Sequence, residues 1–268
     1  IVALLVGEKE FANDTERKEY LKSITMRTMS TATQYEYTNT SYGKIKTSKA
    51  MTTGENPKEV TIYTPFAEDV KDELSAYSPR KQGAGVVNAS KAINSKTYLE
   101  GLTVNDDGSF TNVGNNFAKV ELKNNELIKN GKISIGFRVH NEDTSAKTYK
   151  VSISVMTPQI SGYHNHDNEL ANYVTSDAKY EGAKVQTPYD KALVKDAELG
   201  TITVNASEVK DFTNLNTYSI SDEAKTYLEN FENGTYLEGY VKLTPVGITP
   251  TNSNPVLTMP YMGFYKDY

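Results

Sequence analysis

Hydrophobic side chains recur at every second position in several segments after residue 97, and this period limits the fold more than any other feature. In residues 132–140 they alternate with polar residues or glycine, and the apolar face carries Ile133, Ile135, Phe137 and Val139. Alternation over a short segment predicts a strand with one buried face. Similar segments are residues 118–122, 149–155, 200–204, 236–243 and 256–261. Together they predict an antiparallel β-sandwich over residues 98–268.

Turn and helix signals separate these expected strands. The Asn-Asp-Asp-Gly string at residues 105–108 and the Asn-Gly pair at residues 233–234 are typical of tight turns. Residues 221–231 predict a short helix with Ser221 as its N-cap. Residues 158–199 are polar and poorly patterned, so we expect an excursion loop or an elaboration of one sheet edge there.

The first 97 residues follow a different pattern. Residues 1–7, IVALLVG, are apolar on every side and predict a helix that is buried all round. Asn13 with Glu16 three residues later predicts the start of a second helix. Its apolar face would carry Tyr20, Leu21 and Ile24. Residues 33–76 contain scattered Gly and Pro and predict an irregular insertion with one short helix at residues 66–74.

Residues 77–93, YSPRKQGAGVVNASKAI, combine several local signals. A Ser-Pro turn is followed by the step Gly83-Ala84-Gly85, where the backbone can pack closely or adopt a positive φ. An apolar pair of valines comes next, and Asn88 is a suitable N-cap. The string predicts a strand that runs into a helix.

With its flanks, this string resembles the segment that closes the catalytic domain of subtilisin-like serine proteases, in the form of the large cell-envelope members of the lactocepin and C5a peptidase type. Residues 1–7, the helix after Asn13 and the string Met-Ser-Thr-Ala at residues 29–32 resemble earlier parts of that domain in the same order. Residues 234–245 and 259–268 resemble the last strands of the fibronectin-III-like domain that follows it.

The resemblance implies two parts with different folds. Residues 1–97 would be the C-terminal part of an α/β subtilisin-like peptidase domain, and residues 98–268 an all-β fibronectin-III-like sandwich. Serine-protease catalysis needs a nucleophilic Ser, a His base and an orienting Asp. The family's Gly-Thr-Ser-Met string is absent, and the nucleophilic Ser is expected just before Ile1. We therefore expect no catalytic residue in this segment and no hydrolysis by it alone.

The role that the resemblance implies is structural. Residues 1–7 would continue the helix that presents the serine, and the sandwich would help to position substrates, which are proteins or peptides. The implied partner is the preceding portion of the protease domain in the same protein. The implied location is outside a bacterial cell, secreted or associated with the cell wall.

Composition excludes several other classes. The net charge of -5 and the lack of Lys and Arg clusters disfavour a nucleic-acid partner. The longest apolar run, residues 1–6, is too short to cross a bilayer and has no basic stretch before it, so we expect neither membrane insertion nor a signal peptide. The absence of cysteine rules out disulfides, thiolate nucleophiles and Cys-based zinc sites.

One constellation has the residue types of a metal site. His164 and His166 alternate in sequence and would project to one side of an extended segment, with Asp167 beside them. The spacing matches no strong zinc pattern, so ordinary surface histidines explain them more simply. His140 reads as a rim residue, and the turn at residues 105–108 lacks the glutamate that closes an EF-hand. We expect no cofactor in this segment; calcium would belong to the rest of the full protein.

A second hypothesis comes from a different functional class. The chain could be a cell-surface binding or adhesion module, because loops at the ends of sandwich strands commonly carry binding. Residues 163–173 would then be the first place to look. The tyrosines could form an aromatic platform or could pack in the core and between domains; those considered are Tyr35, Tyr37, Tyr261 and Tyr265. A glycosidase sandwich lacks support, because no carboxylate pair stands out at a strand end.

Overall fold

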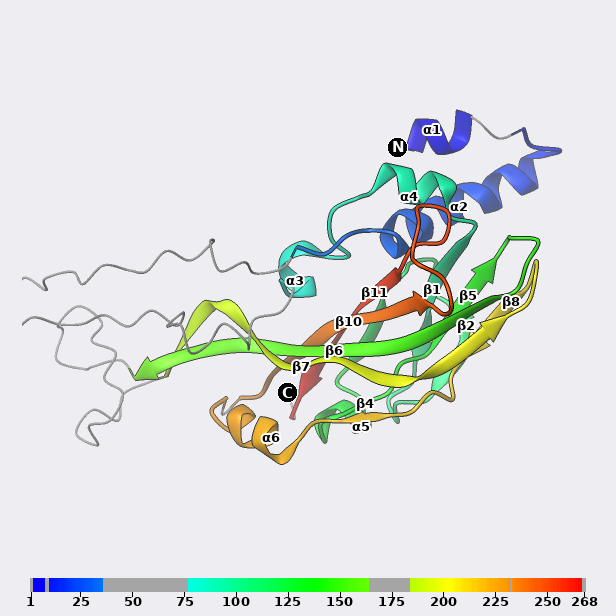
Figure 1. Ribbon diagram of the computed structural model, residues 1–268. Helices are drawn as coiled ribbons and strands as arrows, with labels where there is room; N and C mark the ends of the chain where they lie inside the picture. Colours follow the sequence, from blue (N-terminus) through cyan, green and yellow to red (C-terminus); the bar gives the residue numbers. More distant parts are fainter. Residues whose placement is uncertain (1, 8–9, 36–76, 164–183, 232, 267–268) are drawn as a thin grey trace, which may run out of the picture.

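The computed structural model describes residues 2–7, 10–35, 77–163, 184–231 and 233–266 (Figure 1). The predicted helix at residues 66–74 and nearly all of the predicted insertion lie outside these residues, as do the metal candidates His164, His166 and Asp167. The predictions made for them are neither confirmed nor contradicted.

The larger of two facing sheets has five strands in the order β3-β11-β10-β6-β7. These strands are β3 (Val120–Lys123), β6 (Lys147–Tyr163), β7 (Lys184–Val204), β10 (Thr235–Pro245) and β11 (Leu257–Tyr265). All neighbouring pairs are antiparallel except β11 and β3, which run parallel. The expectation of a purely antiparallel sandwich is therefore wrong at this edge. Strand β3 lies beside β11, the last strand of the chain, and not beside a strand that is its neighbour in the sequence.

The second sheet has four strands in the order β2-β1-β5-β8. They are β1 (Thr97–Val104), β2 (Phe110–Gly114), β5 (Phe137–Asn141) and β8 (Val209–Phe212). A separate two-stranded pair and two short helices close one end; they are β4 (Lys132–Ile133), β9 (Tyr218–Ser219), α5 (Glu126–Lys129) and α6 (Asp222–Leu228). As predicted, Ser221 caps α6, where its Oγ accepts a hydrogen bond from the Ala224 N–H at 3.1 Å.

The core lies between the two sheets and is built from the alternating positions that the sequence marked. Ile133, Phe137 and Val139 are completely buried, and Ile135 is 2% exposed. They pack in one cluster with residues of the five-stranded sheet, among them Val151, Ile153, Val241, Leu243 and Met259. Burying each such side chain contributes about 1.5–3 kcal/mol. The prediction of a β-sandwich after residue 97 is confirmed.

Residues 132–140 nevertheless form two strands instead of one. β4 ends at Ile133 and β5 begins at Phe137, and the two belong to different sheets. Gly136 lies in the break, where the Phe110 ring packs so closely that an added Cβ would be 2.4 Å from its Cγ. Because of this break, the apolar side chains of residues 132–140 are divided between the two-stranded pair and the four-stranded sheet.

For residues 158–199 we expected an excursion loop or an elaboration of one sheet edge, and the described residues of this stretch form the second, since they belong to β6 and to the edge strand β7. β7 begins at Lys184 and pairs with β6 along its length. Its register against β6 shifts at several places, such as between Ile153 and Val155. Each shift moves the following side chains out of the period of two, and β7 is an edge strand whose described side chains, from Asp190 onward, are a mixture of buried, half-buried and exposed. The sequence of residues 184–199 therefore shows no regular alternation, unlike the end of the strand at residues 200–204.

The described residues before β1 form four helices, and we call this part of the chain the helical segment. They are α1 (Val2–Gly7), α2 (Asp14–Ser30), α3 (Pro79–Gln82) and α4 (Ala89–Asn94). As predicted, Asn13 caps α2 by accepting from the Glu16 N–H at 2.9 Å, and Asn88 caps α4 by accepting from the Lys91 N–H at 3.0 Å. Of the predicted apolar face of α2, Ile24 is buried, but Leu21 is 39% exposed.

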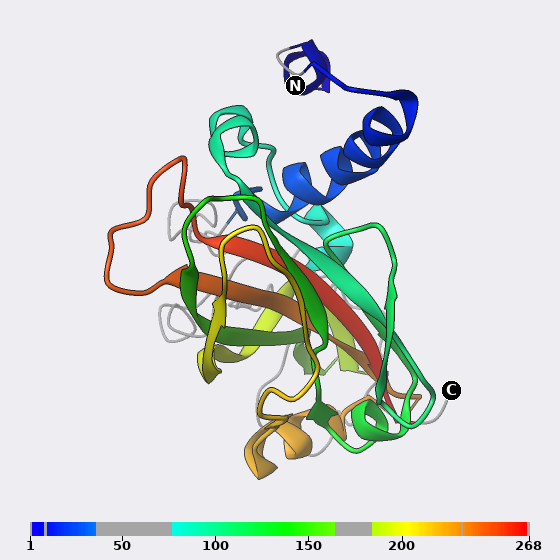
Figure 2. The same ribbon diagram turned by 90° about the vertical axis from the view of Figure 1, so that its right-hand side faces the viewer.

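Helices α1, α2 and α4 lie at one end of the sandwich, and α3 lies against the five-stranded sheet (Figure 2). Helix α2 contacts β1 and β11, and α3 contacts β10 and β11. The expected strand within residues 77–93 shrinks to a single bridge between Val86 and Thr33, preceded by α3. Gly85 permits this bridge because its φ is +110°, and a Cβ there would lie 2.5 Å from the Thr33 carbonyl oxygen.

Candidate functional site at the junction of the helical segment and the sandwich

The junction between the helical segment and the sandwich is built on buried charges. Glu238 lies in β10 and is completely buried on the sheet face that α3 covers. Its Oε1 accepts from the Arg80 Nε at 2.7 Å and lies 2.7 Å from the Arg80 NH2 nitrogen. The Arg80 backbone N–H points at Oε2, 3.3 Å away. A two-pronged guanidinium contact of this kind is geometrically specific, so it fixes α3 at one position on the sheet.

Burial raises the pKa of the Glu238 carboxyl above its ordinary value, although Arg80 favours the charged form. A second buried carboxylate, Asp190 of β7, holds the same short helix. Its Oδ2 accepts from the Lys81 Nζ at 2.7 Å and from the Ser78 N–H at 3.1 Å. Two consecutive basic residues of α3 therefore meet carboxylates on two different strands.

A tyrosine completes the contact below α3. Tyr240 is 1% exposed, and its hydroxyl group lies 2.9 Å from the Gly83 carbonyl oxygen and 3.2 Å from that of Tyr77. Burial raises the pKa of this phenol, so it stays protonated and can donate over the whole physiological range. The turn that ends α3 is thereby tied to the sheet.

The second anchor is Arg27 of α2, which is 5% exposed. Its guanidinium carbon lies 4.3 Å from the centroid of the Tyr98 ring and 5.4 Å from that of Tyr20. It pairs with the Glu142 carboxylate, and its Nε donates to the Ser23 Oγ at 3.1 Å. A buried arginine between two rings and a carboxylate holds α2 against β1.

Hydrogen bonds to backbone groups supply the remaining links. The Ser30 Oγ accepts from the Leu99 N–H at 2.8 Å and lies 2.6 Å from the Met26 carbonyl oxygen. The amide nitrogen of Gln34 donates to the Ala84 carbonyl and to the Thr258 Oγ1, both at 2.8 Å. These bonds join the end of α2 and the residues after it to three other stretches of chain, at Ala84, Leu99 and Thr258.

The Arg27 anchor continues into a charged network on the outer face of the four-stranded sheet. The Tyr98 ring stacks on the His140 imidazole with centroids 4.5 Å apart, and burial raises the Tyr98 pKa to about 12. The His140 Nε2 lies 3.0 Å from the Glu100 Oε2, and Arg138 lies 3.4 Å from the same oxygen. Burial raises the Glu100 pKa, but these groups and the Asn116 N–H outweigh it, so the net pKa is lowered.

The described side chains of this junction form structural contacts between the helical segment and the sandwich. His140 is the one histidine within the described residues, and its partners there are Glu100 and Tyr98 rather than a serine hydroxyl. As expected it lies on the polar face of its strand, but its side chain is only 16% exposed because Tyr98 covers it. The described part contains no group of three or more carboxylate or imidazole side chains suited to a metal.

The turn at residues 105–108 forms as predicted. The Gly108 N–H donates to the Asn105 carbonyl at 2.9 Å, and Asp107 accepts from the Ser109 N–H and hydroxyl. The Asp107 carboxylate is thus used within the turn.

Of the tyrosines considered as a platform, Tyr35 is 63% exposed, but Tyr261 is 1% exposed in the core.

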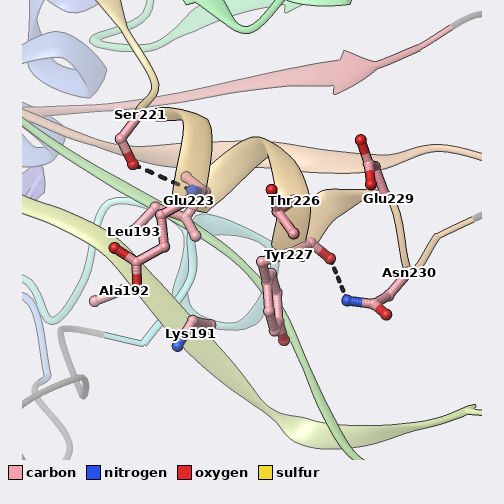
Figure 3. Close-up of a pocket in the computed structure, with 10 residues that line it drawn as sticks. Lys191, Ala192, Leu193, Ser221, Glu223, Thr226, Tyr227, Glu229 and Asn230 are labelled. Atoms are coloured by element: carbon pink, nitrogen blue, oxygen red, sulfur yellow. Dashed lines mark hydrogen bonds between the residues drawn. The ribbon is translucent and has the colours of Figure 1, made fainter.

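A polar hollow of about 650 Å³ lies between β7 and α6 (Figure 3). The Lys191 Nζ lies 5.1 Å from the centroid of the Tyr227 ring, and the Tyr227 hydroxyl donates to the Pro158 carbonyl at 3.2 Å. Ser221 is the serine in its lining, and its Oγ is engaged as the cap of α6. The hollow therefore offers no activated nucleophile.

Sequence reasoning missed the residues that build the junction, although one signal pointed to two of them. The string Thr-Tyr-Leu-Glu-Gly occurs twice, at residues 97–101 in β1 and at residues 235–239 in β10. Each copy places a charged residue inside a buried strand, at Glu100 and Glu238. Each carboxylate then pairs with an arginine. A glutamate in an apolar strand predicts such a buried pair.

The chain matches known proteins over most of its length. It is 26% identical over 211 residues to a C5a peptidase of Streptococcus pyogenes, covering 79% of this chain and 14% of that protein. The C5a peptidase of the M3 strain MGAS315 is 27% identical over the same share of each chain. The matched region thus spans about a seventh of these relatives. Within the described residues no helix is long and apolar enough to cross a membrane.

The family model named Fn3-like domain matches residues 120–262, which is more than half of the chain. The matched stretch begins at β3 and ends within β11, and it contains every strand of the five-stranded sheet. The chain therefore belongs to the Fn3-like domain family.

Proposed function

We propose that the chain is part of a cell-surface serine endopeptidase of the subtilisin-like type, secreted and associated with the cell wall. Residues 1–97 would form the C-terminal end of its catalytic domain, and residues 98–268 the Fn3-like sandwich that follows. The helical segment supports the helix that presents the nucleophilic serine. The sandwich holds that segment in place and helps to position protein substrates for cleavage of their peptide bonds.

The extent of the similarity to the C5a peptidases supports this division. Residues 98–268 number 171, so at least 40 of the 211 matched residues precede Tyr98. The similarity thus reaches from the sandwich into the helical segment. A sandwich shared with unrelated surface proteins would not account for that.

The observation that carries the proposal is the buried polar attachment of the helical segment to the sandwich. Arg27 and Arg80 are anchored in it through Tyr98 and Glu238. A side chain that supports catalysis must be held by rigid packing and by satisfied hydrogen bonds around it. The sandwich supplies both for α2 and α3.

Exposed apolar side chains of the helical segment suggest where the partner lies. Leu21, Val86 and Val87 are 39%, 48% and 47% exposed, although they are large and hydrophobic. Covering them would favour association through the hydrophobic effect. The proposed cover is the preceding portion of the protease domain.

The decisive experiment is to treat the natural protein with a fluorophosphonate probe for serine hydrolases and to determine its intact mass and N-terminal sequence. We expect the probe to label either a longer chain that reads Gly-Thr-Ser-Met just before Ile1 or a companion fragment that copurifies. A natural chain that begins near Ile1, without any labelled species, would contradict the proposal. The chain would then be a binding or adhesion module.

A further inference from the structure

A second hollow, of about 520 Å³, lies where the helical segment ends on the outer face of the five-stranded sheet. Its floor comes from neighbouring strands: Lys242 of β10 is paired directly with Ser152 of β6 on one side and with Thr258 of β11 on the other. Its wall comes from Thr33 and from Lys91 of α4. The volume falls in the range of ordinary small-ligand pockets.

Positive charge prevails in this hollow. Three lysines line it, Lys91, Lys150 and Lys242, against one carboxylate, that of Asp196. Lys242 pairs with Asp196 at 3.0 Å, and Lys150 pairs with Glu198, outside the lining, at 2.8 Å. Lys150 and both carboxylates are more than half exposed, and the Lys242 side chain is 28% exposed, so solvent screens both pairs and they hold their lysines weakly.

Lys91 differs from the other two. It is half-buried, and its Nζ has the Thr33 hydroxyl at 3.4 Å as its hydrogen-bond partner. Within the described residues it forms no ion pair. An ammonium group beside hydroxyls in a sheltered hollow, without a carboxylate of its own, is suited to an anionic group of a ligand.

We infer that this hollow binds a carboxylate of an extended acidic peptide segment. The mixed signs of the lining favour a peptide over a sulfated polysaccharide. Asp196 would repel a continuous polyanion, whereas it can accept hydrogen bonds from the amide N–H groups of a peptide. The hydroxyls of Thr33 and Ser152 can serve both kinds of peptide group. The inference does not depend on the proposed protease function, because binding requires no hydrolysis.

The test is an NMR titration of the full chain with the blocked peptide Gly-Glu-Gly-Glu-Gly. We expect saturable shifts of the Thr33, Lys91 and Ser152 amide signals, and none with the matched peptide that has Gln for Glu. The variant Lys91→Gln should weaken binding about tenfold, since it removes one charge-assisted contact. The control Lys132→Gln removes an exposed lysine of β4, at the opposite end of the sandwich (Figure 1), and should bind like the wild type.

Lys242→Gln keeps the test sound if Lys91→Gln fails to fold, because it removes a charge from the sheet side of the same hollow. It should also weaken binding. Shifts that do not saturate, or equal binding by the wild type and by the folded lysine variants, would overturn the inference. So would tighter binding of a sulfated hexasaccharide at the same amides, which would show that the ligand belongs to another class.

Discussion

The guanidinium carbon of Arg27 lies 4.3 Å from the centroid of the Tyr98 ring, so a cation of α2 is stacked on an aromatic side chain of β1. These residues are 71 positions apart in the sequence. His140 contacts the same tyrosine, because its imidazole ring stacks on the Tyr98 ring with the two centroids 4.5 Å apart. One tyrosine therefore couples the helical segment to the charged outer face of the sandwich.

Replacing Arg27 with methionine should lower the free energy of unfolding by about 2–4 kcal/mol, because the change removes a desolvated cation–π contact and charge-assisted hydrogen bonds. Methionine keeps most of the buried volume, and Glu142, whose side chain is 45% exposed, can be hydrated on its own. Urea unfolding measures the loss. The control Arg17→Met changes an exposed arginine of the same helix and should stay within about 0.5 kcal/mol of the wild type. Equal losses in the two variants would argue against a specific anchor.

The pair formed by Arg80 and Glu238 should show strong coupling. Arg80→Ala leaves the completely buried Glu238 carboxylate without its cation and should cost about 3–5 kcal/mol. The double variant Arg80→Met with Glu238→Leu should be as stable as the wild type or more stable, because it removes both desolvation costs. A double-mutant cycle completed with the single variants Arg80→Met and Glu238→Leu measures the coupling by urea unfolding. Additive losses would mean that the pair does not act as a unit.

Glu100 should make the sandwich sensitive to acid. Its folded pKa is lower than the ordinary value of 4.5, so the unfolded state binds this proton more readily. The resulting stabilisation is complete above about pH 4.5 and is lost as the pH falls through the lowered folded value. Glu100→Gln should therefore reduce the difference in unfolding free energy between pH 7 and pH 3. A variant with the wild-type difference would contradict this role.

Glu238 should behave in the opposite way. Burial raises its folded pKa above 4.5, so its contribution to stability declines as the pH rises from about 4.5 through the raised value. Glu238→Gln removes that decline, and its stability should fall less between pH 4.5 and pH 7 than that of the wild type. The same unfolding series tests both glutamates. If the pH dependence of the unfolding free energy changed with the same sign in Glu100→Gln and Glu238→Gln, the two carboxyl groups would not lie in distinct environments.

The glycine that ends each Thr-Tyr-Leu-Glu-Gly string should tolerate no side chain. A Cβ on Gly239 would lie 1.9 Å from the Ser154 carbonyl oxygen, and one on Gly101 would lie 1.7 Å from that of Lys119. Gly239→Ala should cost about 3 kcal/mol or more in thermal or urea unfolding. The control Gly7→Ala, where nothing lies within 4 Å of the added Cβ, should be neutral or up to about 1 kcal/mol more stable. A harmless Gly239→Ala would mean that β10 and β6 can move apart.

Local signals were sufficient where one stretch of chain decides the structure. The alternation in residues 132–140 correctly placed Phe137 and Val139 in the core, and the caps Asn13, Asn88 and Ser221 were found from their residue types. A cap acts within three residues and an apolar face within one strand. Neither needs information about distant parts of the chain.

Local sequence signals failed where the structure depends on contacts between segments that are distant in the sequence. Nothing within residues 184–199 reveals β7, because its pairing with β6 and its register shifts depend on the partner strand. The parallel pairing of β3 with β11 joins residues more than 130 positions apart. The break at Gly136 follows from the position of the Phe110 ring. Each of these features is a long-range contact.

The sequence by itself determined the β-sandwich after residue 97, the starts of the helices and the resemblance that led to the Fn3-like family. Only the tertiary structure decided what the charged residues do. Arg27, Glu100 and Glu238 are ordinary charges in the sequence, and they become anchors because folding buries them beside oppositely charged groups, Glu238 beside the side chain of Arg80, which is 33% exposed. Burial makes a charge costly unless an opposite charge lies within reach, and that distance is set by the packing of segments far apart in the chain.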